Sequence, residues 1–165
     1  MQEEREDDLR TDAARKRRKD LDELLTSTFT TILRVEERAL QNKLTRGLTI
    51  SEMHTIAAVG LYESNPMNVV AARLDVTLAT LTTAVAKLER KGFVQRSRSK
   101  EDRRKVLVSL TKAGRGAFRA HRLFHRDMVE SALQGLTEEE ERVFADALGK
   151  VKRFFEEEAR KQAGA

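Results

Sequence analysis

The sequence predicts a mainly helical protein with one small β-hairpin. Apolar residues recur at three- and four-residue steps over most of the chain, which is the period of a helix with one buried face. Only residues 93–110 read as strands, in two short runs on either side of a charged loop. The chain has 165 residues, of which 39% are hydrophobic and 36% charged, and this suits one domain with a modest core and a tail.

Composition excludes several classes of protein. No stretch approaches the roughly 20 apolar residues that a membrane span needs, and the N-terminus lacks the apolar segment of a signal peptide. The chain contains no cysteine, so we expect neither a disulfide framework nor a thiol-based site. These observations predict a cytoplasmic protein that makes no contact with a membrane.

The N-terminal third divides into a charged segment and an amphipathic helix. Residues 1–19 carry almost no large apolar side chain, so we expect a charged flexible tail or a frayed helix start. A helical extension stays open, because Arg, Glu, Lys and Ala favour helix. Residues 20–47 are expected to form an N-terminal dimerisation helix that ends near Lys43. Its apolar stripe comprises Leu21, Leu25, Phe29, Ile32, Leu33 and Leu40.

Residues 48–112 are predicted to hold three short helices followed by the hairpin. Ser51 is expected to start the first of these helices, and Pro66 suits the first position of the second. Thr77 is a good N-cap for the third, and Gly92 ends it where a left-handed residue is expected. This order of elements is that of a winged helix-turn-helix.

The hairpin concentrates the positive charge of the chain. Strands are expected over residues 93–98 and 106–110, with Val106, Val108 and Leu110 facing the core. Residues 87–105 include nine basic and three acidic side chains, a net charge of +6, whereas the whole chain carries +5. A basic cluster on such a module predicts double-stranded DNA as the partner.

The third helix of the module is the expected recognition helix. Leu81, Val85 and Leu88 form an apolar face, while the opposite face is small and polar. Threonine offers a hydroxyl to bases or phosphates and a methyl group to thymine, and lysine can reach a phosphate or a guanine. A merely solvated face is the alternative. The expected DNA contacts of this helix are Thr77, Ala79, Thr80, Thr83 and Lys87.

The hairpin is the expected second contact with DNA. Its cationic side chains can neutralise phosphates on both sides of the minor groove, and an arginine at the tip would favour A·T-rich sequence. Asp102 is expected to pair with a neighbouring arginine and hold it extended. A solvated charge run is the alternative. The expected wing residues are Arg96, Arg98, Lys100, Asp102, Arg103 and Arg104.

Residues 113–163 are expected to form two C-terminal dimerisation helices. The first runs to about Leu133 and stops at Gly135, and Thr137 with Glu140 makes a T-x-x-E capping box for the second. A winged module of about 60 residues does not need this much helix for its own core. The apolar stripes of the flanking helices therefore predict a homodimer.

Two segments carry a resemblance to a known family. Asp102–Gly114 resembles the D-R-R…L-T-x-x-G signature of the MarR family of dimeric winged-helix regulators, and Leu88–Val94 resembles its L-E-x-x-G-hydrophobic stretch. The resemblance covers about residues 20–160. It implies a transcriptional regulator that binds a pseudo-palindromic DNA operator as a homodimer.

A narrower similarity connects residues 51–56, 76–80 and 122–131 with the FabT-type repressors of fatty-acid synthesis within that family. It implies a repressor with long-chain acyl-acyl carrier protein as its corepressor and the acyl chain in the helical interior of the dimer. The side chains that could line such a tunnel could equally be ordinary core. They are Phe29, Leu33, Met53 and Ile56.

Two other readings of the sequence compete with this one. His121 and His125 are spaced i, i+4, which can hold zinc, with His54, Glu52 or Asp127 as further ligands. We expect no metal and no other cofactor, because four ligands would have to converge. A MarR-type regulator that responds to zinc or to another small ligand is the alternative. An enzyme is not expected, because the glycines form no phosphate loop and no nucleophile–base arrangement is supported.

Overall fold

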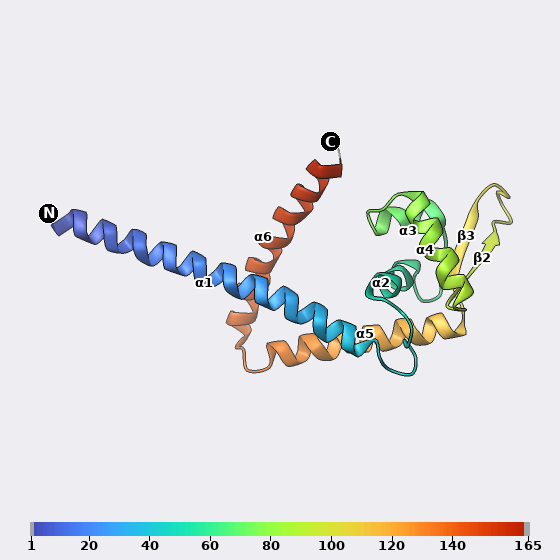
Figure 1. Ribbon diagram of the computed structural model, residues 1–165, viewed down its shortest axis with the longest axis horizontal. Coiled ribbons are helices and arrows are strands. Elements are labelled where there is room, and N and C mark those ends of the chain that lie inside the picture. The colour runs from blue at the N-terminus through green and yellow to red at the C-terminus, as the bar shows by residue number, and fades with distance from the viewer. Residues whose placement is uncertain (1, 164–165) are drawn as a thin grey trace. The chain divides into compact units, whose positions relative to one another are not determined.

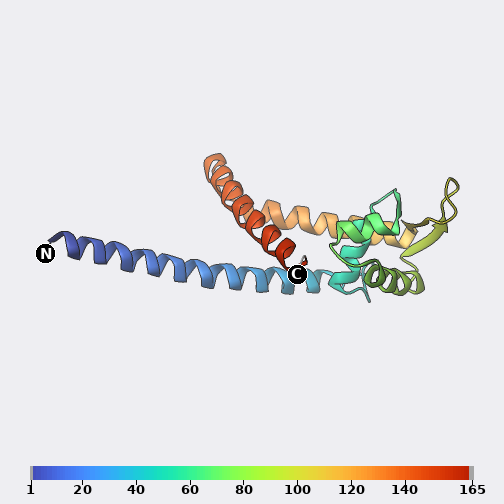
Figure 2. The ribbon, with the colours of Figure 1, turned by 90° about the horizontal axis from the view of Figure 1, so that it is seen from above.

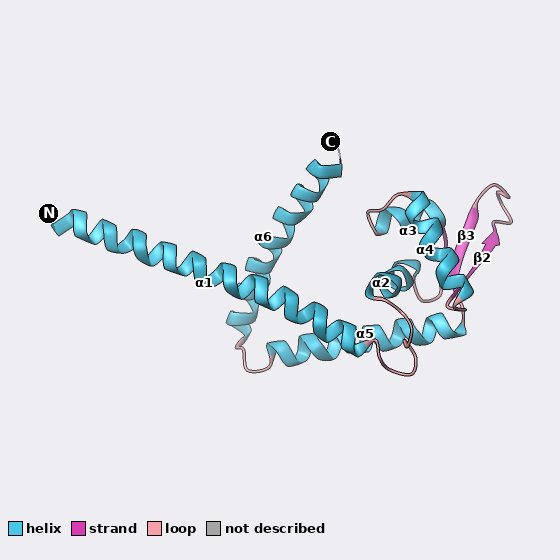
Figure 3. Ribbon diagram, in the orientation of Figure 1, coloured by secondary structure: helices cyan, strands magenta, loops and turns pink. Residues whose placement is uncertain are grey.

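The computed structural model describes the backbone of residues 2–163 and the side chains of residues 12–161. The chain divides into two compact units, residues 1–122 and 123–165. Figures 1 and 3 show a mainly helical chain with a small antiparallel sheet, as predicted. In order, the elements are α1 (Gln2–Ala39), α2 (Ile50–Val59), β1 (Ser64–Pro66), α3 (Met67–Arg73), α4 (Leu78–Arg90), β2 (Val94–Arg98), β3 (Val106–Leu110), α5 (Lys112–Leu133) and α6 (Glu138–Ala163).

Helix α1 differs from the prediction at both ends. It begins at Gln2, so the segment expected as a flexible tail is helical, in keeping with its Arg-, Glu-, Lys- and Ala-rich composition. The helix ends at Ala39, about four residues earlier than expected. The cause is Asn42, whose Oδ1 accepts hydrogen bonds from the backbone N–H groups of Leu44 and Thr45 and turns the chain.

Helix α2 begins with a capping box that the sequence analysis did not identify, since only a helix start at Ser51 was predicted. Thr49, rather than Ser51, is the N-cap. The Thr49 hydroxyl accepts from the Glu52 N–H at 3.2 Å, and the Glu52 carboxylate accepts from the Thr49 N–H at 2.9 Å. Both ends of the T-x-x-E motif are therefore satisfied within one turn.

The sheet has a third strand that the sequence did not reveal. Strand β1 pairs with β3, and the strand order is β1-β3-β2, all antiparallel. A three-residue strand is too short to show an alternating pattern, so no sequence signal marked it. Pro66 ends β1 and is the N-cap of α3, one position before the helical site expected for it.

The core of unit 1–122 lies among α2, α3, α4 and the sheet, and the hairpin projects from these helices (Figure 2). Val108 and Leu110 face this core as expected, but Val106 is 40% exposed, because it pairs with Arg98 at the loop end of the hairpin. The largest fully buried side chains come from all these elements and include Met53, Ile56, Val70, Leu81, Val85, Leu88 and Val108.

In unit 123–165, a turn at Gly135, with φ of +95°, separates the end of α5 from α6. The Thr137–Glu140 capping box is confirmed, with the Glu140 carboxylate 2.8 Å from the Thr137 N–H. Large apolar side chains of α6 are exposed in the single chain, namely Val143, Phe144, Leu148, Phe154 and Phe155.

Within residues 2–163, no single helix is long and apolar enough to cross a membrane. Helices α3 and α4 reach that length and apolar character only together, and a bend of 104° separates them.

Candidate nucleic-acid interface

Helix α4 presents the polar face that the sequence predicts. Its N-cap is Thr77, whose hydroxyl accepts from the Thr80 N–H at 3.2 Å. Leu81, Val85 and Leu88 anchor the helix in the core and are at most 1% exposed. All the side chains predicted to contact DNA from this helix are exposed, namely Thr77, Ala79, Thr80, Thr83 and Lys87.

The threonine hydroxyls of α4 already have partners within the helix. Thr83 donates to the Ala79 carbonyl at 3.2 Å, and Thr82 donates to the Leu78 carbonyl at 2.7 Å. Thr77 and Thr80 share a hydrogen bond of 2.8 Å between their hydroxyl oxygens. Hydroxyls that donate to the backbone keep their lone pairs available, so this face is suited to accept from the amino groups of adenine or cytosine in a major groove.

The wing loop, residues 99–105, is shaped by its own polar side chains. The Ser99 hydroxyl accepts from the N–H groups of Glu101 and Asp102, and the Asp102 carboxylate accepts from the Arg104 N–H at 3.0 Å. Asp102 therefore caps the loop backbone instead of holding an arginine side chain, and its carboxylate forms an ion pair of 4.0 Å with Lys105 Nζ. Arg98, Lys100, Arg103 and Arg104 are exposed along this hairpin.

Arg96 is tied to the recognition helix. Its Nε lies 3.0 Å from Glu89 Oε2, and its backbone N–H donates to Glu89 Oε1 at 3.2 Å. The hydrogen bond from Arg96 is the main reason that the pKa of Glu89 is lowered. Arg96 was predicted as a phosphate contact, and in the structure it also connects β2 with the last turn of α4, so it links the two expected contact elements.

A groove separates α3 and the start of α4 from the loop side of the hairpin. It encloses about 410 Å³. One wall is α3 and the N-terminal turns of α4, including Asn68 and Thr82, and the other is basic. The basic wall consists of Arg96, Arg104 and Lys105. A groove of this polarity beside a polar helix face is suited to a phosphodiester backbone.

The start of α5 is locked to the base of the wing. The Thr111 hydroxyl donates to the Gly92 carbonyl at 2.6 Å and accepts from the Gly114 N–H at 3.1 Å. A Cβ atom at position 114 would overlap the Phe93 carbonyl oxygen, so only glycine fits there. This contact explains the T-x-x-G part of the wing signature.

An ion pair between exposed Lys91 and buried Glu52 fixes the other end of α4. Lys91 Nζ lies 2.6 Å from a carboxylate oxygen of Glu52 and 2.7 Å from the Gly47 carbonyl. Burial alone would raise the pKa of Glu52, but hydrogen bonds from Lys91 and Thr49, together with the Lys91 charge, lower it. Helix α4 is thus held at its C-terminal end by the capped start of α2.

The four residues predicted to line an effector tunnel differ in burial. Met53 and Ile56 are fully buried in the core of the winged module. Phe29 and Leu33 on α1 are 49% and 53% exposed. These four side chains line neither of the two pockets found among the described residues.

The residues that the sequence suggested as zinc ligands also have other partners in the structure. Glu52 binds Lys91, and Asp127 binds Arg126 at 3.1 Å. His54 and His121 instead approach Glu36, which sequence reasoning missed. The sequence did contain a signal, because Glu36 is a charged residue four positions from both Ile32 and Leu40 of the α1 apolar stripe. In the structure Glu36 is indeed only 4% exposed.

This combination of three short helices, a basic hairpin and an exposed polar helix face defines the chain as a winged helix-turn-helix protein. The MarR family model matches residues 48–106. A computed superposition on Streptococcus pneumoniae FabT in complex with DNA gives a TM-score of 0.79 with 40% identity, and it covers 84% of this chain and 97% of FabT. The chain belongs to the MarR family.

Curated relatives agree with this assignment. The regulator BilQ of Clostridium symbiosum is 31% identical over 111 residues, which cover 64% of this chain and 76% of BilQ. The regulator YwhA of Bacillus subtilis is 35% identical over 79 residues, 47% of this chain and 57% of YwhA. The chain thus spans little more than half the length of YwhA. The chain is a DNA-binding transcriptional regulator and not an enzyme.

Proposed function

We propose that this protein is a homodimeric repressor that binds a pseudo-palindromic operator. Helix α4 enters the major groove, the wing follows the adjacent backbone, and the two recognition helices of the dimer lie about one DNA turn apart. The observation that supports this most directly is the polar face of α4 beside the basic groove formed by Arg96, Arg104 and Lys105.

The proposed dimer is supported by apolar side chains that a single chain leaves in water. On α1, Leu21, Leu24 and Leu25 are between 40% and 63% exposed. On α6, Leu148, Phe154 and Phe155 are between 51% and 57% exposed. Full burial of an exposed apolar side chain contributes about 1.5–3 kcal/mol. Because these side chains are about half exposed, each would contribute roughly half of that when a second copy covers the stripes.

We further propose that the genes controlled are those of fatty-acid synthesis and that long-chain acyl-acyl carrier protein is the corepressor. The similarity to FabT, at 40% identity over 97% of its length, supports this assignment. Phe29 and Leu33 would contact the acyl chain, because they are exposed apolar side chains. Met53 and Ile56 are fully buried, so they would support such a site only from within the core of the winged module.

The experiment measures binding to the DNA upstream of the protein's own gene as a function of salt, with and without long-chain acyl-acyl carrier protein. Arg104→Ala should weaken binding to all sequences and reduce the salt slope by about one unit, because one phosphate contact is lost. The control is Arg142→Ala, since Arg142 is an exposed arginine of α6 that pairs with Glu139. Acyl-acyl carrier protein should tighten binding of the wild type.

The experiment tests the DNA contact of the wing and the identity of the corepressor independently. If Arg104→Ala keeps wild-type affinity and salt dependence, the wing is not the phosphate contact. If the wild type binds DNA but acyl-acyl carrier protein does not tighten binding, the chain is a regulator with a different effector.

A further inference from the structure

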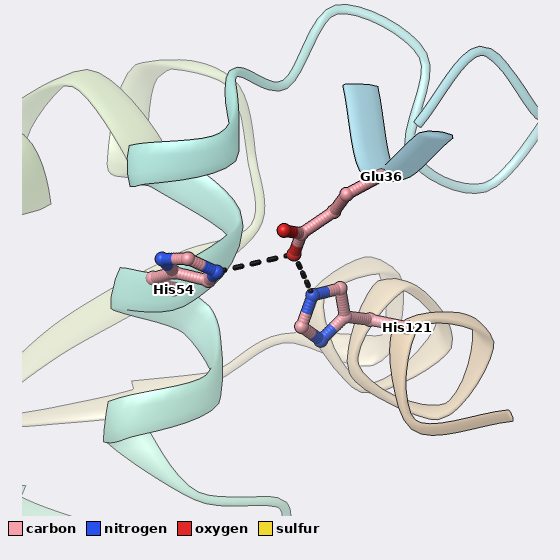
Figure 4. Close-up of side chains that lie close together, drawn as sticks. All are labelled: Glu36, His54 and His121. Carbon is pink, nitrogen blue, oxygen red and sulfur yellow. Dashed lines mark hydrogen bonds and ion pairs between the residues drawn. The ribbon is translucent and has the colours of Figure 1, made fainter. Parts of the chain in front are cut away.

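Three side chains from three helices of unit 1–122 converge on one point (Figure 4). Glu36 comes from α1, His54 from α2 and His121 from α5. Glu36 Oε1 lies 3.1 Å from His54 Nε2 and 2.9 Å from His121 Nε2. The nearest ligand atoms of the three residues all lie within 4.8 Å of one another. The chain thus brings together residues that are 18 and 85 positions apart.

The burial of this cluster is unusual for its chemistry. The side chains of Glu36 and His121 are 5% and 8% exposed. A carboxylate in such a position is costly unless it is paired or bound to a metal ion. The His54 side chain is 47% exposed, so solvent can reach the cluster from its side.

The geometry matches the first coordination shell of a zinc ion. Bonds of about 2.0–2.1 Å in a tetrahedral site place neighbouring ligand atoms about 3.3 Å apart. The distances from Glu36 Oε1 to His54 Nε2 and to His121 Nε2 are only slightly shorter than this. Two imidazoles and one carboxylate are also a ligand set that zinc takes in proteins, whereas Mg²⁺ and Ca²⁺ require oxygen ligands.

We propose that Glu36, His54 and His121 bind Zn²⁺, with the fourth position open to water on the exposed side of His54. The site would join α1, α2 and α5. Helix α2 also carries Glu52, which holds the end of α4 through Lys91. The start of α5 is bonded to the base of the wing through Thr111. Zinc would therefore fix the arrangement of both expected DNA-contacting elements and tighten operator binding by lowering the entropy lost on binding.

The first test measures zinc binding by the full chain, without a metal-binding tag, in competition with a chromophoric chelator. The wild type should bind one Zn²⁺ per chain, and millimolar Mg²⁺ should not compete. Glu36→Gln and His121→Ala should each weaken zinc binding by at least about 100-fold, since even outer-shell changes cost about 10–100-fold. Glu37→Gln is the matched control, because Glu37 is the exposed neighbour of Glu36 on α1.

Circular dichroism is used to check that each variant is folded. The Glu36→Gln change preserves the shape of the side chain. A wild-type protein that binds no zinc at micromolar concentrations would overturn the proposal, and the three residues would then form a hydrogen-bonded contact alone. Zinc binding by Glu36→Gln equal to that of the wild type would overturn it as well, because the ion would lie elsewhere.

The second test concerns the coupling to DNA, and this part depends on the proposed function. Binding of a labelled duplex from the upstream DNA is measured with Zn²⁺ and with EDTA. Zinc should tighten binding by the wild type about tenfold, within the usual range of such coupling. Glu36→Gln should bind DNA as the zinc-free wild type does, under both conditions. Zinc binding without any change in DNA affinity would refute the coupling and leave the metal site standing.

Discussion

Helix α2 of the winged module and helix α6 begin with the same local motif but differ in their tertiary contacts. Helix α2 of the module and helix α6 each start with a T-x-x-E capping box, Thr49–Glu52 and Thr137–Glu140. In α2 the glutamate is 8% exposed and also binds Lys91, 39 positions away. In α6 the glutamate is exposed, and the hydrogen bonds described for it stay within its own turn. A capping motif predicts where a helix begins, but tertiary contacts decide how much depends on it.

The apolar faces of the two regions differ in the same way. Met53 and Ile56 of α2 are completely buried, whereas Leu148 and Phe154 of α6 remain 53% and 57% exposed. The hydrophobic stabilisation of the module is therefore already present in one chain, while that of α6 requires another surface. Changes in the module should affect folding, and changes in α6 should affect association.

The largest effect is expected where the module is packed most tightly. Gly114→Ala should lower the free energy of unfolding by about 3 kcal/mol, because the added methyl group would overlap the Phe93 carbonyl oxygen at the base of the wing. Denaturant unfolding followed by circular dichroism measures the change.

The control for this variant lies two residues further along the same helix. At Gly116 an added Cβ would lie 3.8 Å from Leu44 Cδ2, an ordinary contact. Gly116→Ala should therefore be neutral or stabilising by up to about 1 kcal/mol, because alanine favours helix over glycine. Equal losses at both positions would show that the approach of α5 to the wing is not the constraint.

A smaller effect, on association alone, is expected from α6. Leu148→Glu should weaken the proposed dimer by about 2 kcal/mol, roughly 30-fold in the dissociation constant, because a charge would enter an apolar interface. Sedimentation equilibrium measures the change in association. The winged module, with its own core, should keep its unfolding midpoint.

Arg153→Glu is the control for the α6 variant, because residue 153 lies on the side of the helix away from the apolar stripe and is exposed. It changes the net charge more than Leu148→Glu does. Weaker association of Arg153→Glu by the same amount would mean that charge, and not the apolar stripe, controls assembly.

The same comparison explains which elements of the fold could be predicted from the sequence. Helix α4 and the hairpin were predicted correctly, because Thr77, Gly92 and the periodicity of Leu81, Val85 and Leu88 are local signals. Strand β1 was missed, since its pairing with β3 depends on residues more than 40 positions away. The helical state of residues 2–19 was left open, because composition alone does not decide between a tail and a helix.

The same distinction between local signals and tertiary contacts applies to the candidate site. The exposure of the α4 threonines follows from helical periodicity, but the role of Arg96 does not, because its partner Glu89 lies on a different element. The convergence of Glu36 with His54 and His121 joins three helices, and no spacing within one helix encodes it. Only the charged side chain within the α1 apolar stripe marked Glu36 as unusual.

The smallest expected effect is a pH-dependent difference in stability between variants of the two capping boxes. Because the pKa of Glu52 is lowered in the folded state, its stabilisation is fully present above the ordinary glutamate pKa of about 4.3 and is lost as the pH falls through the lowered pKa. Glu52→Gln should cost about 1 kcal/mol at pH 7, which is the typical net contribution of an intramolecular hydrogen bond. The difference from the wild type should shrink as the pH approaches 3, which unfolding at a series of pH values measures.

Glu140→Gln is the matched change in the exposed box. The pKa of Glu140 is also lowered, by its hydrogen bonds with Thr137, so the sign of the pH dependence is the same. Water screens this carboxylate fully, and the described residues give it no distant partner comparable with Lys91, so its effect should be clearly smaller than that of Glu52→Gln. If the two variants lost the same stability with the same pH profile, the contact with Lys91 would add nothing to the cap, and α2 would be held by its local hydrogen bonds as α6 is.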